Sequence, residues 1–362
     1  MDISGFLLES GWNTVVVILL SVVLLAVGFV CLIKGADWFV DGAAGIAAKA
    51  KIPALVIGLT IVAFGTSAPE LATSLSSAMK ESVGIAIGNV LGSNICNILL
   101  ILGLSAVIAP LPVQKDSLKI DIPVLLGASG LIILFGVTGK DGGEIARWEG
   151  AIMAALLVAY VVFLVWKALR GRKKEGTMSL ENHEVVTEEE QEKKNKFGAW
   201  YEKMKGKLWF LIVLAIVGMG IIVLGSTLAV EGAKTVAAKA GIPENIVGLT
   251  IVAIGTSLPE LITSVVAAKK GETDIAVGNI VGSNIFNILF VAGLSAVVFP
   301  LPFAPGGVSF LVDSIIAIGA AALLALFVYL PGHKLRRWNG AIFLVGAVAY
   351  YAYCVVSALG VI

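Results

Sequence analysis

Charged side chains are scarce in this chain: they make up 14% of its 362 residues, against about 25% in an ordinary soluble domain. Apolar residue types account for 58%, and the mean hydropathy is +0.97. A soluble fold of this length cannot bury that much apolar surface. The composition therefore excludes an ordinary soluble protein and indicates one that lies in a lipid bilayer.

Cysteine and histidine are also rare, with three and two residues. The odd, scattered set Cys31, Cys96 and Cys354 excludes a disulfide framework or a zinc site, and we expect small core residues there. His183 and His333 lie in predicted loops. Without a nucleophile–base pair or a HExxH motif, we do not expect an enzyme. The first apolar run follows no basic segment or cleavage site, so no cleaved signal peptide is expected.

Long uncharged runs are abundant, and many reach the roughly 20 residues that a helix needs to cross a bilayer. A membrane barrel would instead show alternating segments of about 10 residues. We therefore predict an all-α polytopic protein of about ten spans. The predicted spans are 15–33, 54–79, 84–109, 121–138, 147–166, 208–230, 244–269, 274–299, 309–330 and 337–358.

The chain repeats itself after 190 residues: Gly58–Pro112 aligns to Gly248–Pro302 without a gap, and 35 of these 55 positions are identical. This predicts two five-span halves, residues 1–166 and 208–362, joined by a polar linker, 167–207. An odd number of spans per half gives the halves opposite orientations. We therefore expect inverted repeats, related by a pseudo-two-fold axis in the membrane plane.

Lysine and arginine predict the orientation, because cytoplasmic loops carry an excess of them. With the N-terminus outside, 21 of the 26 basic residues fall inside, 11 of them in the linker. We therefore expect both termini outside the cell membrane and the linker in the cytoplasm, as a solvated connection.

Two carboxylates interrupt the apolar runs at equivalent positions: Glu70 in AFGTSAPELATS, which starts at Ala63, and Glu260 in AIGTSLPELITS, which starts at Ala253. An ionised side chain at bilayer depth costs about 2.5–3.5 kcal/mol on insertion scales, so its presence indicates a functional role. The alternative is that both acids cap helix breaks or pair with a lysine, but no Lys, Arg or His lies deep in any predicted span.

Oxygen atoms surround these acids. Residues four apart share a helix face, which aligns Thr66 with Glu70, and Ser67 lies one step away. Pro69 has no N–H, so we expect the helix to open there and turn backbone carbonyls near Ala63 inward. The same holds for Ala253, Thr256, Ser257 and Glu260. Carboxylate, hydroxyl and carbonyl oxygens together suit hard cations such as Ca²⁺ and Na⁺.

A second polar cluster follows in each half, GNVLGSNICN from Gly88 and GNIVGSNIFN from Gly278. Its glycines are explained by close helix packing, and packing also explains Asn89, Asn94, Asn279 and Asn284. Four further residues are predicted ion ligands because each Ser–Asn pair is four residues apart. They are Ser93, Asn97, Ser283 and Asn287.

With these motifs in register twice, the chain resembles the cation/calcium exchanger superfamily, and within it the prokaryotic sodium/calcium exchangers. The resemblance covers essentially the whole chain. It implies a core of the second and third spans of each half around several cation sites. It also implies first and sixth spans that slide over this core, and three Na⁺ exchanged for one Ca²⁺. The ligands would be Ala63, Thr66, Ser67, Glu70, Ser93 and Asn97 of the first half and Ala253, Thr256, Ser257, Glu260, Ser283 and Asn287 of the second.

Details of the motifs discriminate among branches of that superfamily. Relatives that need potassium carry Asp where this chain has Asn287, and proton-coupled relatives carry a GNATE-like repeat that GTSAPE does not match. We therefore expect Na⁺-driven export of Ca²⁺. A proton/Ca²⁺ exchanger is the alternative, and a cation channel is a weaker one.

Expected partners are the two ions and the bilayer, with no nucleic acid and no resident cofactor. We expect a monomer.

Overall fold

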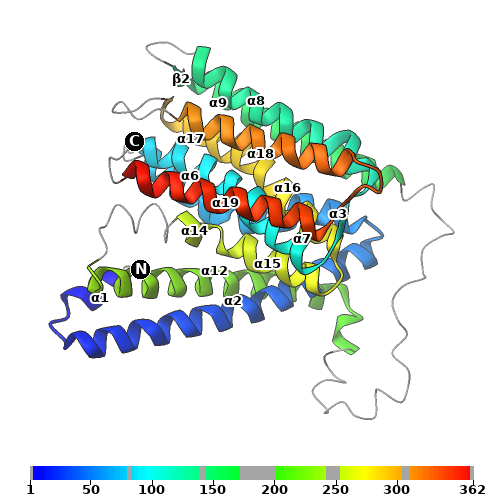
Figure 1. Ribbon diagram of the computed structural model, residues 1–362. Helices are drawn as coiled ribbons and strands as arrows, with labels where there is room; N and C mark the ends of the chain where they lie inside the picture. Colours follow the sequence, from blue (N-terminus) through cyan, green and yellow to red (C-terminus); the bar gives the residue numbers. More distant parts are fainter. Residues whose placement is uncertain are drawn as a thin grey trace.

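The computed structural model describes residues 3–79, 83–138, 143–171, 201, 203–241, 253–303 and 310–358. Nearly all of them are helical (Figure 1). A helix satisfies its own backbone hydrogen bonds, which a segment at bilayer depth requires. The predicted class, an all-α polytopic membrane protein, is confirmed.

Eight helical segments of the described ranges are long and apolar enough to cross a bilayer, and two helices that meet at a bend form a ninth span. The tenth predicted span, 244–269, begins outside the described residues. In the first half the spans are α2 (Thr14–Ala50); α3 (Ala54–Ile57) with η1 (Gly58–Val62), α4 (Ala63–Thr66) and α5 (Ala68–Met79); α6 (Val83–Ile95) with η2 (Cys96–Leu102) and α7 (Gly103–Ile108); η3 (Ser117–Asp121) with α8 (Ile122–Thr138); and α9 (Arg147–Gly171). In the second half they are α12 (Leu208–Lys239); α16 (Thr273–Phe286) with η5 (Asn287–Ala292) and α17 (Gly293–Val298); α18 (Leu311–Tyr329); and α19 (Arg337–Ala358). The short α1 (Ile3–Glu9) precedes them, and α14 (Ala253–Thr256) and α15 (Leu258–Lys269) belong to the tenth.

The second span bends by 45° between Thr66 and Ala68, where the proline break was predicted. Pro69 cannot donate to the carbonyl of Gly65, so the α-helical ladder is interrupted there. In the other half, Pro259 likewise cannot donate to the carbonyl of Gly255. That carbonyl instead accepts a hydrogen bond from Ser226 Oγ of α12 at 2.9 Å. Each break starts a new helix, with a glutamate in its first turn.

Two short strand pairs show how the halves are oriented. β1 (Leu111–Pro112) pairs with β4 (Lys334–Leu335), and β2 (Glu144–Ile145) pairs with β3 (Leu301–Pro302). In the repeat, β1 corresponds to β3 and β2 to β4. One span separates the two strands of each half, which therefore lie on opposite sides of the membrane. Pairing of unlike strands requires that one half be upside down relative to the other, which confirms the inverted repeats.

The helices α2 and α12 form an antiparallel pair beside the other spans (Figure 1). Both are longer than the predicted spans, at 37 and 32 residues, because each helix continues past its apolar run. Glycine recurs every seven residues at their contact. A Cβ on any of these glycines would meet the backbone of the partner helix at 2.6–2.8 Å. The glycines are Gly28, Gly35 and Gly42 on α2 and Gly218, Gly225 and Gly232 on α12.

We expect Gly218→Ala to destabilise this helix pair. The added Cβ would lie 2.6 Å from the backbone nitrogen of Phe39, so the helices must separate, at a cost of about 1–3 kcal/mol. Thermal unfolding in detergent measures the effect. Gly220→Ala on the same helix is the matched control, because nothing lies within 4 Å of its Cβ position. Equal melting temperatures for the two variants would contradict the steric argument.

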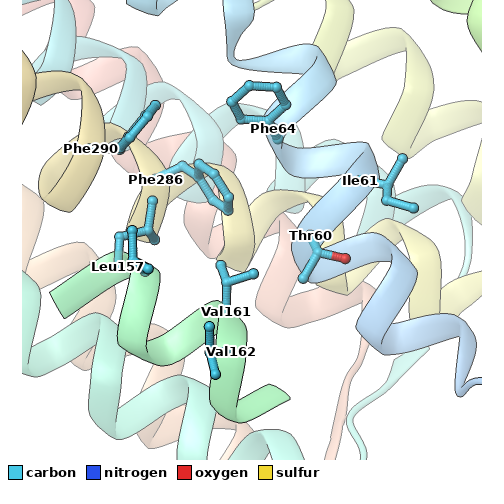
Figure 2. A pocket seen from close by; sticks show the side chains of 9 residues that line it. Thr60, Ile61, Phe64, Leu157, Val161, Val162, Phe286 and Phe290 are labelled. Carbon is cyan, nitrogen blue, oxygen red and sulfur yellow. The ribbon is translucent and has the colours of Figure 1, made fainter. Parts of the chain in front are cut away.

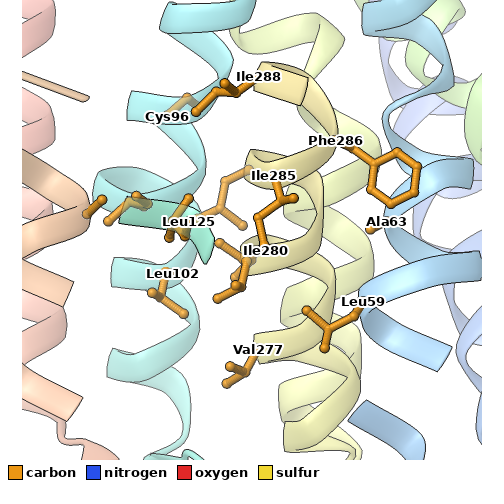
Figure 3. Packing of buried hydrophobic residues seen from close by; sticks show 14 of the residues in the cluster. Leu59, Ala63, Cys96, Leu102, Leu125, Val277, Ile280, Ile285, Phe286 and Ile288 are labelled. Atoms are coloured by element: carbon orange, nitrogen blue, oxygen red, sulfur yellow. The ribbon is translucent and has the colours of Figure 1, made fainter. Parts of the chain in front are cut away.

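The centre of the bundle is α16, in which every residue from Ile275 to Phe286 is buried. Figure 3 shows its apolar side chains among those of the neighbouring spans, with Leu59 and Ala63 on one side. A Cβ at Gly278 would meet the carbonyl oxygen of Leu55 at 2.8 Å, and one at Gly282 would meet Ala63 Cβ at 2.7 Å. Close packing at these two glycines is therefore confirmed. The same prediction is wrong for Gly92, where a Cβ would meet nothing within 4 Å, and at Gly88 a Cβ would make only ordinary contact with the ring of Phe310 at 3.4 Å.

Candidate cation site

The structure brings the two glutamates together at the middle of the bundle. Glu70 and Glu260 are each the third residue of a helix, α5 and α15, and neither is exposed at all. The N-terminal end of a helix carries partial positive charge, which favours a carboxylate in its first turn. The proline breaks therefore lower the cost of holding these acids at bilayer depth.

Each carboxylate accepts a hydrogen bond from the other half. Ser67 Oγ donates to Glu260 Oε1 at 3.0 Å, and Ser257 Oγ donates to Glu70 Oε1 at 3.3 Å. Ser283 Oγ lies 3.5 Å from Glu260 Oε1. The predicted clusters from both halves thus converge on one site.

Five buried oxygen atoms of the predicted ligands have no hydrogen-bond partner. They are Glu70 Oε2, Glu260 Oε2, Ser93 Oγ, Asn97 Oδ1 and Asn287 Oδ1. Buried oxygens are ordinarily paired, so a group of unpaired ones indicates a place for a bound species. Hard cations take such oxygens as ligands. Among the described residues, no group of three or more His, Cys, Asp or Glu side chains is placed to hold a metal ion.

Three predicted ligands differ from the others. The carbonyl of Ala63 accepts from Ser67 N at 3.0 Å and from Thr66 Oγ1 at 3.3 Å, so the break does not free it. Thr256 is only partly buried, whereas its counterpart Thr66 is fully buried. The side chain of Ala253 lies outside the described part of the chain, although α14 begins at this residue.

Asn89 and Asn279, interpreted from sequence as packing residues, make polar bridges between the halves. Thr66 Oγ1 donates to Asn279 Oδ1 at 2.9 Å, and Thr256 Oγ1 to Asn89 Oδ1 at 3.4 Å. Asn279 Nδ2 in turn donates to Ser264 Oγ at 2.9 Å, and Asn89 Nδ2 donates to Ser74 Oγ at 2.8 Å. Their equivalence in the repeat was the available signal. Only the structure shows which half each one contacts.

Two further acids, each hydrogen-bonded to a tyrosine, were also missed. Asp121 accepts from Tyr160 OH at 2.8 Å, and Asp313 accepts from Tyr350 OH at 3.1 Å. Each pair joins the fourth span of its half to the fifth. Both acids lie at the ends of predicted spans, where an acidic residue looks like an ordinary flank.

Widened helical turns adjoin the site: the π-helical segment η2 begins at Cys96, and η5 begins at Asn287. Such turns occur often at functional sites. They shift the side chains that follow out of α-helical register, which positional spacing alone does not predict.

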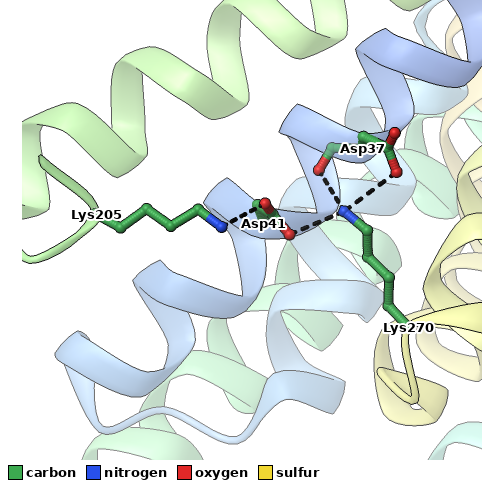
Figure 4. A network of polar contacts seen from close by, with 4 residues as sticks. All are labelled: Asp37, Asp41, Lys205 and Lys270. Carbon is green, nitrogen blue, oxygen red and sulfur yellow. Dashed lines mark hydrogen bonds and ion pairs between the residues drawn. The ribbon is translucent and has the colours of Figure 1, made fainter. Parts of the chain in front are cut away.

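The two sides of the site are covered differently. On the side of β1 and β4, α2 packs against α15, and the Lys270 ammonium contacts Asp41 Oδ1 at 2.9 Å and Asp37 Oδ1 at 3.3 Å (Figure 4). Lys205 also contacts Asp41, at 2.6 Å. Among the described residues, the equivalent packing of α12 against α5 is slight or absent. The two halves are therefore packed differently around the site, with α2 covering α15.

An apolar cavity of about 360 Å³ lies near the site, between η1, α4, α9 and the junction of α16 with η5 (Figure 2). Phe64, Phe286 and Phe290 line it together with aliphatic residues of α9. None of the twelve predicted ligands lines it, so it is distinct from the candidate cation site.

A family model described as sodium/calcium exchanger protein matches residues 20–166 and 210–357. The chain belongs to the sodium/calcium exchanger family. It is 34% identical to the sodium/calcium exchanger MaX1 of Methanosarcina acetivorans, over 92% of this chain and 98% of that one. It is 35% identical to the inner membrane protein YrbG of Escherichia coli, over 78% and 81%.

A solved structure of the sodium-calcium exchanger NCX_Mj superposes with a TM-score of 0.74 at 32% identity, covering 92% of this chain and 98% of that chain. The resemblance inferred from the repeated motifs is therefore confirmed. Membership of the sodium/calcium exchanger family places the chain among multi-pass membrane transporters.

Proposed function

We propose that this chain exchanges Na⁺ for Ca²⁺ by alternating access at the site between its halves. The five unpaired buried oxygens, two of them from carboxylates, are the observation that supports it. Ca²⁺ takes about 6–8 oxygen ligands, and Na⁺ is suited by the same oxygens. Family membership supports the choice of these two ions.

In this proposal Glu70 and Glu260 are shared by all bound ions. The remaining ligands are hydroxyl and amide oxygens, with the carbonyl of Ala253; they are Thr66, Ser67, Ser93, Asn97, Thr256, Ser257, Ser283 and Asn287. The carbonyl of Ala63 is left out of this set because it already accepts two hydrogen bonds. Because each half supplies one carboxylate, a single chain holds a complete site, and we propose that it acts as a monomer.

The proposal includes Na⁺ as the driving ion, because Asn97 and Asn287 are neutral and leave only two acids at the site. We expect proteoliposomes loaded with Na⁺ to take up ⁴⁵Ca²⁺ without K⁺. Vesicles loaded with choline, and vesicles with the Glu70→Gln variant, are the controls. A strict need for K⁺ would refute the proposed coupling. Uptake driven by a pH gradient and indifferent to Na⁺ would identify a proton/Ca²⁺ exchanger instead.

We also propose that the termini lie outside the cell membrane and that the linker, 167–207, lies in the cytoplasm. The excess of lysine and arginine in the linker supports this. A single cysteine in the linker should then react with an impermeant maleimide only after the cells are opened, and a cysteine at Ser10 should react in intact cells. The reverse pattern would invert the orientation.

A further inference from the structure

Three kinds of polar contact at the site occur in both halves, as the repeat requires. A serine donates to the opposite glutamate, a threonine donates to an asparagine of the other half, and that asparagine donates to a serine of its own half. Most polar groups around the carboxylates therefore follow the pseudo-two-fold symmetry.

Four asparagines do not follow it. We call Asn94, Asn97, Asn284 and Asn287 the asparagine network. Asn97 Nδ2 donates to Asn284 Oδ1, and Asn94 Nδ2 donates to the backbone carbonyl of Asn284, both at 3.2 Å. All four side chains are buried. Both hydrogen bonds thus converge on Asn284, and Asn94, its counterpart in the repeat, accepts neither equivalent bond.

The missing half of this pattern can be derived from the repeat, in which Asn94 corresponds to Asn284 and Asn97 to Asn287. The swapped pattern would have Asn287 Nδ2 donating to Asn94 Oδ1, and Asn284 Nδ2 donating to the carbonyl of Asn94. The three side-chain atoms that these bonds need, Asn287 Nδ2, Asn94 Oδ1 and Asn284 Nδ2, are buried and unpartnered here. The structure therefore contains one of two equivalent patterns, with the groups for the other in place.

The packing around the two glutamate-bearing helices is also asymmetric. Among the described residues, α2 packs against α15, whereas α12 makes little or no contact with α5. Val266 of α15 is 9% exposed, but its counterpart in α5, Ser76, is exposed. In an inverted repeat, exchanging the conformations of the two halves yields the state that faces the opposite side. The asymmetric hydrogen bonds and the asymmetric packing then belong to one conformation.

We propose that the asparagine network changes to its swapped pattern when the transporter changes the side that it faces, and that Asn94 and Asn284 are positioning residues. An amide that donates through Nδ2 directs its Oδ1 the opposite way. Asn284 thus directs the free Oδ1 of Asn97 in this state, and Asn94 would direct that of Asn287 in the other. Both the ligand role of Asn97 and Asn287 and the link between the pattern and the side that the transporter faces rest on the proposed function; the labelling experiment tests that link without measuring transport.

Aspartate substitutions separate the two patterns, because aspartate keeps the acceptors of asparagine and loses its donor. Asn94→Asp removes a bond of the observed state and keeps the acceptor of the swapped one. Asn284→Asp does the reverse. The readout uses a background without Cys31, Cys96 and Cys354, with choline as the only cation. The rate of maleimide labelling at Ser76→Cys, divided by the rate at Val266→Cys, reports which of the two conformations is populated.

One hydrogen bond changes a two-state ratio by about fivefold. We expect Asn94→Asp to lower the Ser76→Cys to Val266→Cys labelling ratio by about that factor, and Asn284→Asp to raise it. The double variant should return close to the parent ratio. Shifts of both single variants in one direction, or no shift, would overturn the proposal.

A second pair of variants removes one donor from one pattern only. Asn97→Leu should lower the labelling ratio, and Asn287→Leu should raise it, in protein that elutes as a single species in detergent. This pair tests the proposal even if the aspartate variants do not fold. Opposite shifts together with normal Ca²⁺ transport in the leucine variants would refute the ligand roles and leave the network intact. Loss of Ca²⁺ transport in the leucine variants without any shift in labelling would support the ligand roles and refute the change of pattern.

Discussion

Replacement of either central carboxylate by glutamine, Glu70→Gln or Glu260→Gln, should abolish Na⁺-driven Ca²⁺ uptake. Glutamine has nearly the same shape and still accepts the serine hydrogen bond at 3.0–3.3 Å, so the fold should persist. The charge of the empty site falls from −2 to −1. Removing one partner from a buried charge pair costs about 3–5 kcal/mol, which corresponds to a loss of Ca²⁺ affinity of about 150- to 4000-fold. Initial rates of ⁴⁵Ca²⁺ uptake measure the loss.

Glu149→Gln is the matched control for these variants. Glu149 is 5% exposed and accepts from Ala146 N at 2.8 Å in the first turn of α9, away from the candidate cation site. Glutamine can keep that bond through its carbonyl oxygen, so transport should be preserved. A Glu70 or Glu260 variant that transports as fast as Glu149→Gln would refute the site.

Membrane voltage should shift the Ca²⁺ gradient that the exchanger can sustain. Two carboxylates give the empty site a charge of −2. One Ca²⁺ brings it to zero, and three Na⁺, the number that the family resemblance implies, bring it to +1. Each cycle then moves one positive charge inward with Na⁺, so a negative interior favours Ca²⁺ export. One charge across 100 mV is worth about 2.3 kcal/mol, or about 50-fold in the equilibrium Ca²⁺ ratio.

Proteoliposomes clamped with valinomycin and K⁺ gradients, at constant Na⁺ and Ca²⁺ gradients, measure this shift. Vesicles that contain Glu70→Gln correct for leak. A Ca²⁺ distribution that is independent of the imposed voltage would rule out three-for-one exchange and indicate two Na⁺ per Ca²⁺.

Local sequence was sufficient for the parts of the molecule that depend on composition and position along the chain. Apolar runs predicted the spans, because a bilayer demands continuous helices. Pro69 predicted the bend before Glu70, because proline lacks the donor that Gly65 needs. The repeat, with five spans in each half, predicted the inversion that the pairing of β1 with β4 confirms. The repeated motifs also predicted the family.

The tertiary structure alone decided which atoms meet. Ser67 lies close to Glu70 in sequence yet donates to Glu260, 193 residues away, and no periodicity encodes that contact. The two halves carry nearly the same motifs, so local sequence predicts the same environment for Asn94 as for Asn284. In the folded chain Asn284 accepts two hydrogen bonds and Asn94 accepts neither equivalent bond, and among the described residues α2 packs against α15 with no comparable contact of α12 with α5. A repeated sequence specifies both arrangements equally, and the packing of the whole chain determines which one is present.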